Sequence, residues 1–202
     1  MRRLGLFGGT FNPPHLAHKR LSDEMRERLS LSEVLIMPTF TPPHKEAKNL
    51  ASSEDRLEMC RRTFSDDFYK VSDLEIKREG KSYTVDTLLE LKEIYPEDKI
   101  YLIIGSDMLL SFHKWYRYRD ILSLCTLCVI SRDDDETVKM LSDYAKDVLN
   151  RDEDKGEIII SSASPIELSS TLIREKLSKG EDVSSFIEEK TLEYIKEKGL
   201  YL

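Results

Sequence analysis

A doubly wound α/β fold, with a mostly parallel sheet and helices on both faces, is the fold class that this sequence predicts. Short apolar segments alternate along the chain with longer segments in which apolar residues recur at helical spacing. Strands that are buried on both faces and joined by helices produce this alternation. The chain has 202 residues, of which 40% are hydrophobic. This is enough for one core and does not require a second, so we predict a single domain over residues 1–202.

The individual elements follow from their local patterns. Leu4–Phe7 is a short apolar run, and similar runs predict strands at Val34–Met37, Leu74–Ile76, Ile100–Ile104, Leu127–Ser131 and Ile158–Ser161. Pro13 or Pro14 is suited to the first turn of a helix. Amphipathic patterns predict helices at Pro14–Leu29, Glu54–Phe64, Val85–Ile94, Thr137–Leu149 and Thr171–Leu177, with C-terminal helices inside residues 165–202. Two polar stretches, Phe40–Ala51 and Arg132–Glu136, are predicted loops, and the first is a candidate cover for a ligand.

The charge balance restricts the class of partner. The formal net charge is -7 at pH 7, and the pI is about 5.3. A broad nucleic-acid interface needs an excess of basic residues, so we expect no nucleic-acid partner and expect any anion to bind in a local cleft. No apolar run approaches the roughly 18 residues of a membrane span, and the N-terminal region lacks the apolar core of a signal peptide. We therefore expect a cytoplasmic protein without a membrane partner, and the sequence is compatible with a homo-oligomer.

The cysteines Cys60, Cys125 and Cys128 are predicted to be reduced thiols. An odd number in a chain without a secretion signal does not suggest a disulfide framework. Cys125 and Cys128 form a C-x-x-C pattern, but apolar residues surround it and no second pair exists, so buried packing is favoured over a zinc or redox site. The run Asp133–Asp135 is interpreted as a solvated turn rather than a metal site. We predict no resident metal ion.

The residues after the first predicted strand have the features of a phosphate site. Gly8 and Gly9 allow a close backbone approach, and Thr10 adds a hydroxyl group. His15 and His18 are three residues apart and share one face of the predicted helix. The first N–H groups of that helix point back to the same place, where its dipole favours an anion. Histidines at this spacing could also be half of a zinc site, but no third ligand is spaced nearby, so donation to phosphate is favoured.

A second group of anion donors lies far along the chain. Ser169 or Ser170 is suited to cap a helix, in which Ile173 and Leu177 would face the core. Arg174 has a planar fork of N–H donors that suits phosphate oxygens. The two predicted helix starts are therefore expected to bind one anion.

These motifs together resemble those of a known superfamily. Residues 8–18, Gly-Gly-Thr-Phe-Asn-Pro-Pro-His-Leu-Ala-His, and residues 169–174, Ser-Ser-Thr-Leu-Ile-Arg, are similar to the HxGH and SSTxIR signatures of nucleotidyltransferases. Further matches follow the order seen in bacterial nicotinate-mononucleotide adenylyltransferases: Pro42–Lys45, Ser82–Thr84, Ile103–Asp107 and the pair Trp115–Tyr116. The resemblance covers essentially the whole chain, and six motifs are far more specific than one glycine loop. It departs at Asn12, where many relatives have aspartate, and at Ala17, where they have glycine.

The resemblance implies a Rossmann-like fold and transfer of AMP from ATP to nicotinate mononucleotide. The products would be nicotinate adenine dinucleotide and pyrophosphate, in a step of NAD synthesis, and Mg²⁺ would enter with the ATP phosphates. The catalytic residues implied by the resemblance are His15, His18, Lys45 and Arg174. Those implied for ATP are Gly8, Gly9, Thr10, Phe11, His15, His18, Gly105, Asp107, Ser169, Ser170, Thr171 and Arg174. Those implied for nicotinate mononucleotide are Thr10, His44, Lys45, Tyr83, Thr84, Asp107, Trp115 and Tyr116, with Trp115 stacked on the ring and Thr84 beside its carboxylate.

Several of these residues also have ordinary interpretations. Asp107 could cap a helix over Met108–Phe112, and Lys45 could be an exposed lysine. Trp115 by itself fits a half-buried aromatic residue. Acidic residues follow Arg132 where relatives often have proline and glycine, so a contact from Arg132 to ATP stays open.

The chemistry that these residue types support is adenylyl transfer. The attacking phosphate is already ionised at neutral pH, so the protein only has to hold two anions in line and neutralise the developing charge. Three alternatives are another adenylyl- or cytidylyltransferase, such as one that acts on phosphopantetheine, a nucleotide-binding sensor without turnover, and a fragment of an aminoacyl-tRNA synthetase. The Pro42–Lys45, Ser82–Thr84 and Trp115 segments favour the pyridine-nucleotide enzyme over the first. The complete set of donors disfavours the second, and the acidic composition disfavours the third.

Overall fold

The described part of the chain contains six strands, which form one sheet of the predicted doubly wound class. A computed structural model describes residues 1–42, 49–131, 135–162 and 168–202. The strands are β1 (Arg3–Gly9), β2 (Glu33–Pro38), β3 (Tyr69–Val71), β4 (Lys99–Gly105), β5 (Thr126–Ser131) and β6 (Ile158–Ser162), in the order β3-β2-β1-β4-β5-β6. The pairs β1–β4, β4–β5 and β5–β6 are parallel. The winding reverses between β1 and β4, which is the strand order of a Rossmann fold and confirms the predicted class.

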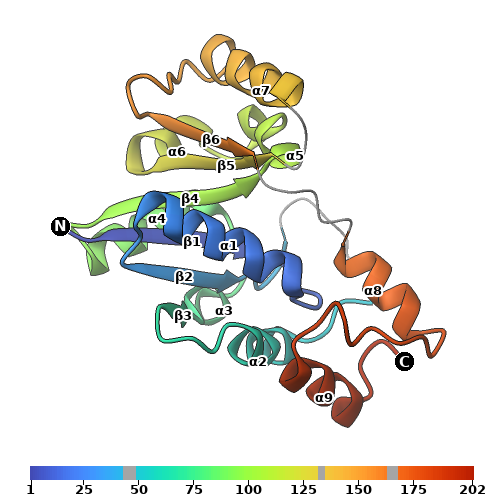
Figure 1. Ribbon diagram of the computed structural model, residues 1–202. Helices are drawn as coiled ribbons and strands as arrows, with labels where there is room; N and C mark the ends of the chain where they lie inside the picture. Colours follow the sequence, from blue (N-terminus) through green and yellow to red (C-terminus); the bar gives the residue numbers. More distant parts are fainter. Residues whose placement is uncertain (43–48, 132–134, 163–167) are drawn as a thin grey trace. The chain divides into compact units, whose positions relative to one another are not determined.

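The helices of the described residues include the five whose bounds were predicted, each within two residues of the prediction (Figure 1). The described helices are α1 (Leu16–Leu29), α2 (Ser53–Thr63), α3 (Leu74–Arg78), α4 (Thr84–Ile94), α5 (Ser106–Leu109), α6 (Tyr118–Leu124), α7 (Asp135–Asp147), α8 (Ser170–Leu177) and α9 (Glu189–Lys198), with a 3-10 helix η1 at Phe112–Lys114. The short elements α5, η1 and α6 were not predicted. None of the helices in the described ranges combines the length and the apolar character that a membrane crossing requires.

Two of the predicted elements are wrong or shifted. Leu74–Ile76 was predicted as a strand but belongs to helix α3, and the third strand is Tyr69–Val71 instead. The strand is selected by distant contacts, because the Tyr69 hydroxyl lies 2.7 Å from Ser22 Oγ and donates to Asp23 Oδ1 at 2.6 Å. A local apolar pattern does not contain that information.

The start of the first helix also differs from the prediction. Neither Pro13 nor Pro14 opens it, because α1 begins at Leu16. The His15 carbonyl accepts the N–H of His18 at 2.9 Å and that of Lys19 at 3.3 Å, so His15 is the residue that starts the helical hydrogen bonds. The two prolines therefore belong to the loop between β1 and α1.

The described residues group into two compact units. The first unit comprises Met1–Phe7, Glu24–Val34 and Tyr83–Ile166, and the second comprises Gly8–Asp23, Leu35–Ser82 and Glu167–Leu202. That residues 1–202 behave as one domain stays a prediction.

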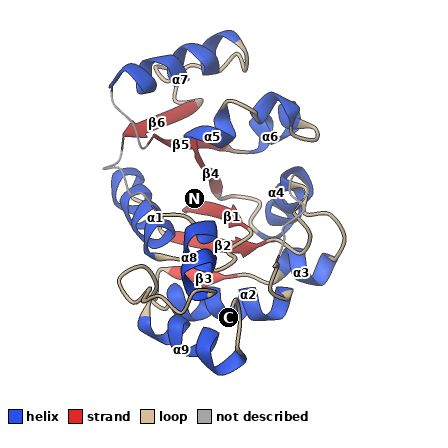
Figure 2. Cartoon of the chain, turned by 90° about the vertical axis from the view of Figure 1, so that its right-hand side faces the viewer, coloured by secondary structure: helices blue, strands red, loops and turns tan. Residues whose placement is uncertain are grey.

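The first unit has its core between β4, β5 and the helices α4 and α6. Leu102, Leu127, Leu88 and Ile121 are buried, and each such aliphatic side chain contributes about 1.5–3 kcal/mol relative to an exposed one. Helices α4 and α6 pack together on the same side of these strands, as Figure 2 shows, while α7 packs against β6.

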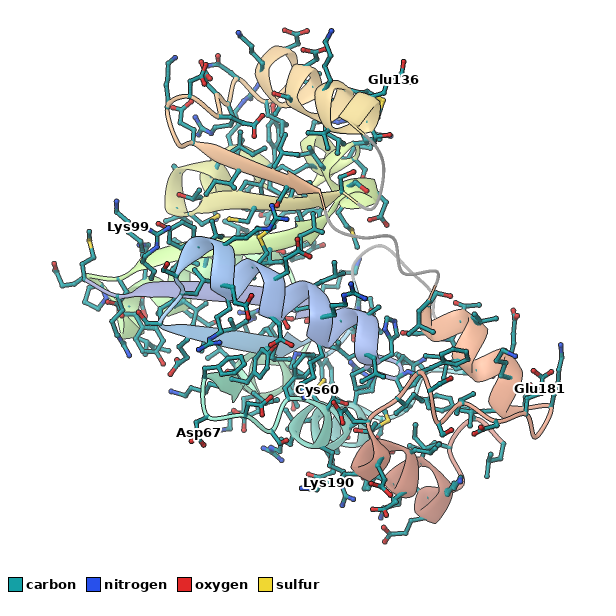
Figure 3. The ribbon with its side chains drawn as sticks, viewed as in Figure 1. Cys60, Asp67, Lys99, Glu136, Glu181 and Lys190 are labelled. Carbon is teal, nitrogen blue, oxygen red and sulfur yellow. The ribbon has the colours of Figure 1, made fainter. Side chains whose placement is uncertain are left out.

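The second unit has its core between β3, α2 and α9. Helices α2 and α9 lie side by side (Figure 1), and Figure 3 shows Cys60 on α2 and Lys190 at the start of α9. Between the two helices, the buried hydroxyl oxygens of Thr63 and Thr191 lie 2.8 Å apart. Since buried hydroxyl groups are costly without a partner, this pair contributes to the register of α9 on α2.

The cysteines are free thiols, as predicted. Burial raises the pKa of Cys60 and Cys128 well above the ordinary value, and it raises the pKa of Cys125 to about 12. A thiol with a raised pKa is a weak nucleophile and a weak metal ligand. These environments support the interpretation that the cysteines serve packing.

Asp98 ties the start of β1 to the turn before β4, and this contact predicts a pH dependence of stability. The backbone N–H of Arg2 donates to Asp98 Oδ1 at 2.8 Å, and the Arg2 guanidinium lies 2.8 Å from Oδ2. The backbone hydrogen bond from Arg2 lowers the pKa of Asp98 against the opposing effect of burial, and the Arg2 side chain adds to the lowering. The stabilisation is therefore complete above the unfolded-state pKa of about 3.9 and is lost as pH falls through the folded-state pKa.

We expect Asp98→Asn to lower the melting temperature at pH 7, because the amide keeps the shape but loses the charge. The difference between the two proteins should shrink as pH falls below about 4, where the wild-type carboxylate becomes protonated. Thermal denaturation of both proteins from pH 7 to pH 3 measures this. A difference that stays constant over that range would contradict the assigned role of the Asp98 charge.

Candidate active site

The predicted glycine pair, Gly8 and Gly9, ends strand β1, and the loop that follows contains a strained phenylalanine. Phe11 has a φ of 49°, in the left-handed region that side chains rarely adopt. Its ring folds back over Gly9, where a Cβ atom would lie only 3.1 Å from it. Gly8 has more room, since the nearest atom to a Cβ there is the Met37 carbonyl oxygen at 3.9 Å. The close approach that requires glycine is therefore made by the Phe11 ring at position 9.

The two predicted histidines lie together directly after this loop. Their rings are stacked with centroids 3.6 Å apart and an interplanar angle of 24°. His15 is only 2% exposed, whereas His18 is half-buried. The backbone N–H of His15 donates to His18 Nδ1 at 3.2 Å. Because Nδ1 accepts a hydrogen bond, the proton of the neutral His18 ring is on Nε2, which makes Nε2–H a donor of fixed direction.

Helix α8 brings the second predicted group of donors to the same loop. Ser169 caps the helix, since its Oγ accepts the N–H of Leu172 at 3.2 Å. Ser170 Oγ donates to the Pro13 carbonyl at 2.8 Å. Arg174 donates to the Asn12 carbonyl at 2.8 Å and to Thr171 Oγ1 at 3.3 Å.

The two helix starts predicted to bind one anion are thus held next to each other within the second unit. In the same helix, Ile173 and Leu177 are buried, as predicted.

Asn12 is a structural residue of this loop that the sequence reasoning did not identify. It is 3% exposed, and both ends of its amide are hydrogen-bonded. Its Oδ1 accepts the N–H of Ala51 at 3.1 Å and the hydroxyl of Tyr201 at 2.6 Å. Its Nδ2 donates to the Asn49 carbonyl at 3.0 Å. The amide therefore acts as donor and acceptor at once, which an aspartate at this position could not do.

Arg56 is a second residue that the motifs did not reveal. It is only 1% exposed, and its guanidinium donates to the carbonyl oxygens of Thr10 at 2.9 Å, Phe40 at 3.0 Å and Ala51 at 3.2 Å. Burial lowers the pKa of Arg56, although an arginine stays protonated at neutral pH. One signal was available, because Arg56 occupies the buried stripe of α2 together with Met59 and Cys60.

A separate group of predicted residues lies in the first unit. The rings of Tyr83 and Tyr116 have centroids 4.7 Å apart, and Tyr116 is 53% exposed. The Trp115 ring packs against Phe112 with centroids 4.8 Å apart. Thr84 is the first residue of α4, as given above, and the Tyr83 carbonyl accepts the N–H of Asp86 at 3.1 Å. The first N–H groups of a helix have no carbonyl partner within it, so the start of α4 presents donors beside these aromatic rings.

Asp107 does not cap a helix, so that interpretation was wrong. Helix α5 starts at Ser106, Gly105 is the residue at its N-terminal boundary, and no side chain caps it. Asp107 lies in the first turn and is exposed. Its Oδ1 lies 2.7 Å from the position that a Cβ on Gly105 would take, so the glycine leaves room for the carboxylate.

The predicted site residues thus fall into two groups. Those in the second unit are Gly8, Gly9, Thr10, Phe11, His15, His18, Ser169, Ser170, Thr171 and Arg174. Those in the first unit are Tyr83, Thr84, Gly105, Asp107, Trp115 and Tyr116. The predictions for His44, Lys45, Arg132, Asp133 and Asp134 lie outside the described residues.

Comparison with known proteins gives the family of this chain. A family model described as cytidylyltransferase-like matches residues 6–176. A protein of Oceanobacillus iheyensis named probable nicotinate-nucleotide adenylyltransferase is 36% identical over 100% of this chain and 97% of its own length. One of Enterococcus faecalis with the same name is 38% identical over 99% of this chain and 85% of its own length.

A solved structure of similar fold comes from Plasmodium falciparum. It is a nicotinic acid mononucleotide adenylyltransferase complexed with NaAD, at a TM-score of 0.76 and 19% identity, with 100% of this chain and 98% of that chain covered. At this identity the likeness shows the fold, whereas the family rests on the matched family model and the closer bacterial relatives. The chain belongs to the cytidylyltransferase-like family and, within it, to the nicotinate-nucleotide adenylyltransferases.

Proposed function

We propose that this protein transfers AMP from ATP to nicotinate mononucleotide, giving nicotinate adenine dinucleotide and pyrophosphate in NAD synthesis. The observation that carries the proposal is the pair of hydrogen bonds from α8 to the loop after β1. Through them, Ser170 and Arg174 lie beside the segment that leads into His15 and His18. A histidine N–H, hydroxyl groups and a guanidinium on one short surface are donors suited to phosphate oxygens.

The phosphates of ATP are proposed to bind to this group of donors in the second unit. His18 Nε2–H would donate to a nonbridging oxygen, and Arg174 has further N–H groups beyond those that hold Asn12 and Thr171. The nicotinate mononucleotide phosphate attacks the α-phosphorus, the bond to the leaving pyrophosphate breaks, and no protein nucleophile is needed. Each donor aimed at the developing charge can contribute on the order of 3 kcal/mol to the rate.

Four further assignments rest on the resemblance. Lys45 is proposed as a further catalytic cation and His44 as a further phosphate contact, while Gly105 and Asp107 are proposed to bind the ribose hydroxyls. The exposed carboxylate of Asp107 is chemically suited to accept hydrogen bonds from hydroxyl groups.

Mg²⁺ is proposed to enter as part of the MgATP substrate. The N–H groups of His18 and Arg174 donate to phosphate oxygens and have no lone pair with which to coordinate a divalent cation. The ion would supply charge neutralisation on the phosphates while the side chains orient them.

The nicotinate end is proposed to bind to the aromatic group in the first unit. Trp115 would stack on the pyridine ring, with Tyr83 and Tyr116 beside it. The ring carboxylate would accept hydrogen bonds from Thr84 and from the N–H groups at the start of α4, where the helix dipole favours a negative charge.

The protein is further proposed to act in the cytoplasm and without nucleic acid. Reduced, buried thiols suit a reducing compartment, and a net charge of -7 disfavours binding to a polyanion.

The direct test offers the purified protein ATP, Mg²⁺ and a panel of phosphate acceptors. We expect a product with the mass of nicotinate adenine dinucleotide, with pyrophosphate released in equal amount. The panel should include phosphopantetheine and nicotinamide mononucleotide. A dinucleotide formed only from another acceptor would contradict the proposed substrate, and no product at all would contradict the proposed activity.

Arg174→Lys is expected to lower activity although the charge is kept. A lysine has no planar fork, so it cannot hold the Asn12 carbonyl and a phosphate oxygen in the same geometry. We expect kcat/KM for ATP to fall about tenfold or more. Lys176→Ala is the matched control, because this residue of the same helix pairs with Glu181 at 2.6 Å. If Arg174→Lys kept both kcat and KM for ATP, Arg174 would be a purely structural contact of the loop.

A further inference from the structure

We propose that Arg56 is a positioning residue for adenylyl transfer: its buried guanidinium holds the Thr10–Phe11 peptide so that the Phe11 ring keeps His18 in place. The inference rests on the proposed function, because that function assigns His18 to the ATP phosphates. It adds to the site a residue of α2, a helix that contributes none of the predicted phosphate donors.

The hydrogen bonds of Arg56 join parts of the second unit that are distant in sequence. The guanidinium donates to Thr10 in the loop after β1, to Phe40 after β2 and to Ala51 just before α2. A buried charge is costly unless its donors are satisfied, and a side chain needed only for volume would be apolar. The position is therefore specialised for holding carbonyl groups, and one of these belongs to the loop with the strained residue.

The Thr10 carbonyl belongs to the peptide that determines the backbone angle of Phe11. The angle φ of Phe11 describes rotation about its N–Cα bond relative to the plane of the Thr10–Phe11 peptide. Because the peptide unit is planar, a hydrogen bond that fixes the direction of the Thr10 C=O also fixes that plane. Phe11 has a φ of 49°, which is unfavourable for a bulky side chain and persists only where the surroundings enforce it. The bond from Arg56 at 2.9 Å is one such constraint, and the packing of the Phe11 ring on Phe64, with centroids 6.0 Å apart, is another.

The Phe11 ring carries this constraint to His18. The edge of the ring meets the His18 ring with centroids 5.1 Å apart and an interplanar angle of 69°. His18 also stacks on His15, and its Nδ1 accepts the backbone N–H of His15. If Phe11 relaxed to an ordinary backbone angle, its ring would leave this place. His18 would keep the stack on His15 and the bond to Nδ1 but lose the contact with the Phe11 ring, so the direction of its Nε2–H group would be less restricted.

The experiment compares variants of two buried residues on α2. Arg56→Lys keeps the charge but cannot reach all of the carbonyl groups, and Arg56→Met removes the donors. Thr63→Val is the matched control, because it breaks the buried pair with Thr191 and loosens α2 against α9 without touching the loop. For each protein we would measure the melting temperature, kcat, KM for both substrates and the ¹⁵N NMR shifts of the His18 ring without substrate.

We expect Arg56→Lys to lower kcat about tenfold to a hundredfold, since misplacing a catalytic group by about 1 Å can cost this much. The KM values should change little, and the His18 shifts should indicate a mixture of tautomers. Thr63→Val should lose comparable thermal stability but keep kcat and the His18 shifts. An Arg56→Lys protein with kcat within about twofold of wild type and unchanged His18 shifts would overturn the proposal. So would an equal loss of kcat in Thr63→Val, because that would show general loosening.

Two further arms keep the test decisive. Phe11→Leu keeps the carbonyl groups that Arg56 binds and removes the ring, with its contacts to His18 and Phe64. It should therefore reproduce the change in the His18 shifts even where the Arg56 variants fail to fold. Unchanged shifts in Phe11→Leu would overturn the proposal. The NMR measurement needs no turnover, so a wild-type protein that made no dinucleotide would refute the proposed function while the positioning of His18 was still tested.

Discussion

Replacing His18 by alanine is expected to lower kcat by about a hundredfold or more while the protein stays folded. The variant removes a donor whose direction is fixed by the hydrogen bond to Nδ1 and by the stack on His15. Donors of this kind contribute mainly to transition-state stabilisation. The side chain is only half-buried, so the loss of packing should be small. Steady-state kinetics together with a circular dichroism spectrum measures both parts of the expectation.

A second substitution tests which nitrogen of His18 acts. Glutamine can place an amide N–H close to the position of Nε2, so His18→Gln should keep more activity than His18→Ala. His113→Ala is the matched control, because this exposed histidine bonds to Tyr144 at 2.6 Å and is not among the predicted site residues. Near-normal activity in a folded His18→Ala protein would show that the histidine motif had been misinterpreted.

Nicotinate mononucleotide is expected to be preferred over nicotinamide mononucleotide by some thirty- to a thousandfold in kcat/KM. The proposed pocket at the start of α4 presents donors only, and a carboxamide brings its own N–H groups to it. Replacing a charge-assisted hydrogen bond by facing donors costs roughly 2–4 kcal/mol, which corresponds to that range of rates. Initial rates with both nucleotides at several concentrations give the ratio.

Variants of the pocket separate stacking from carboxylate recognition. Trp115→Ala should weaken both nucleotides and change their ratio little, because stacking does not distinguish acid from amide. Thr84→Val should reduce the ratio, since it removes a hydroxyl donor while keeping the size of the side chain. Equal kcat/KM values for the two nucleotides in the wild-type protein would contradict the proposed carboxylate pocket but not the proposed adenylyl transfer.

The fold was predictable where a strand or helix carries its own pattern. The apolar runs at β1, β4 and β5 and the amphipathic α2 and α4 were located to within two residues, because burial leaves a periodic trace in the sequence. Strand β3 was missed, since Tyr69 is selected by hydrogen bonds to Ser22 and Asp23 on another element. Helices α5 and α6 are too short for periodicity to identify.

The candidate site was predictable only as far as side-chain chemistry shows in a motif. Histidines that follow a glycine pair, and an arginine that follows serines, indicate an anion site. The aromatic group around Trp115 was found by resemblance alone. Neither the motifs nor the resemblance indicated the structural roles of Asn12 and Arg56. Each acts mainly on backbone carbonyl and N–H groups, which every residue has, so their partners leave no trace in the sequence.

The effect of replacing Asn12 depends on the residue at position 201, because the Tyr201 hydroxyl donates to the Asn12 side chain. An aspartate there would place an oxygen against the Asn49 carbonyl, while its charge would come to rely on the Ala51 N–H and the Tyr201 hydroxyl. Tyr201→Phe should thus be tolerated better with asparagine at position 12 than with aspartate there. With aspartate, the loss of the hydroxyl would leave a buried carboxylate without one of its hydrogen-bond donors. Two changes that each survive alone would then fail together. A lineage that went from aspartate and tyrosine at these positions to asparagine and phenylalanine would therefore have to replace the aspartate first.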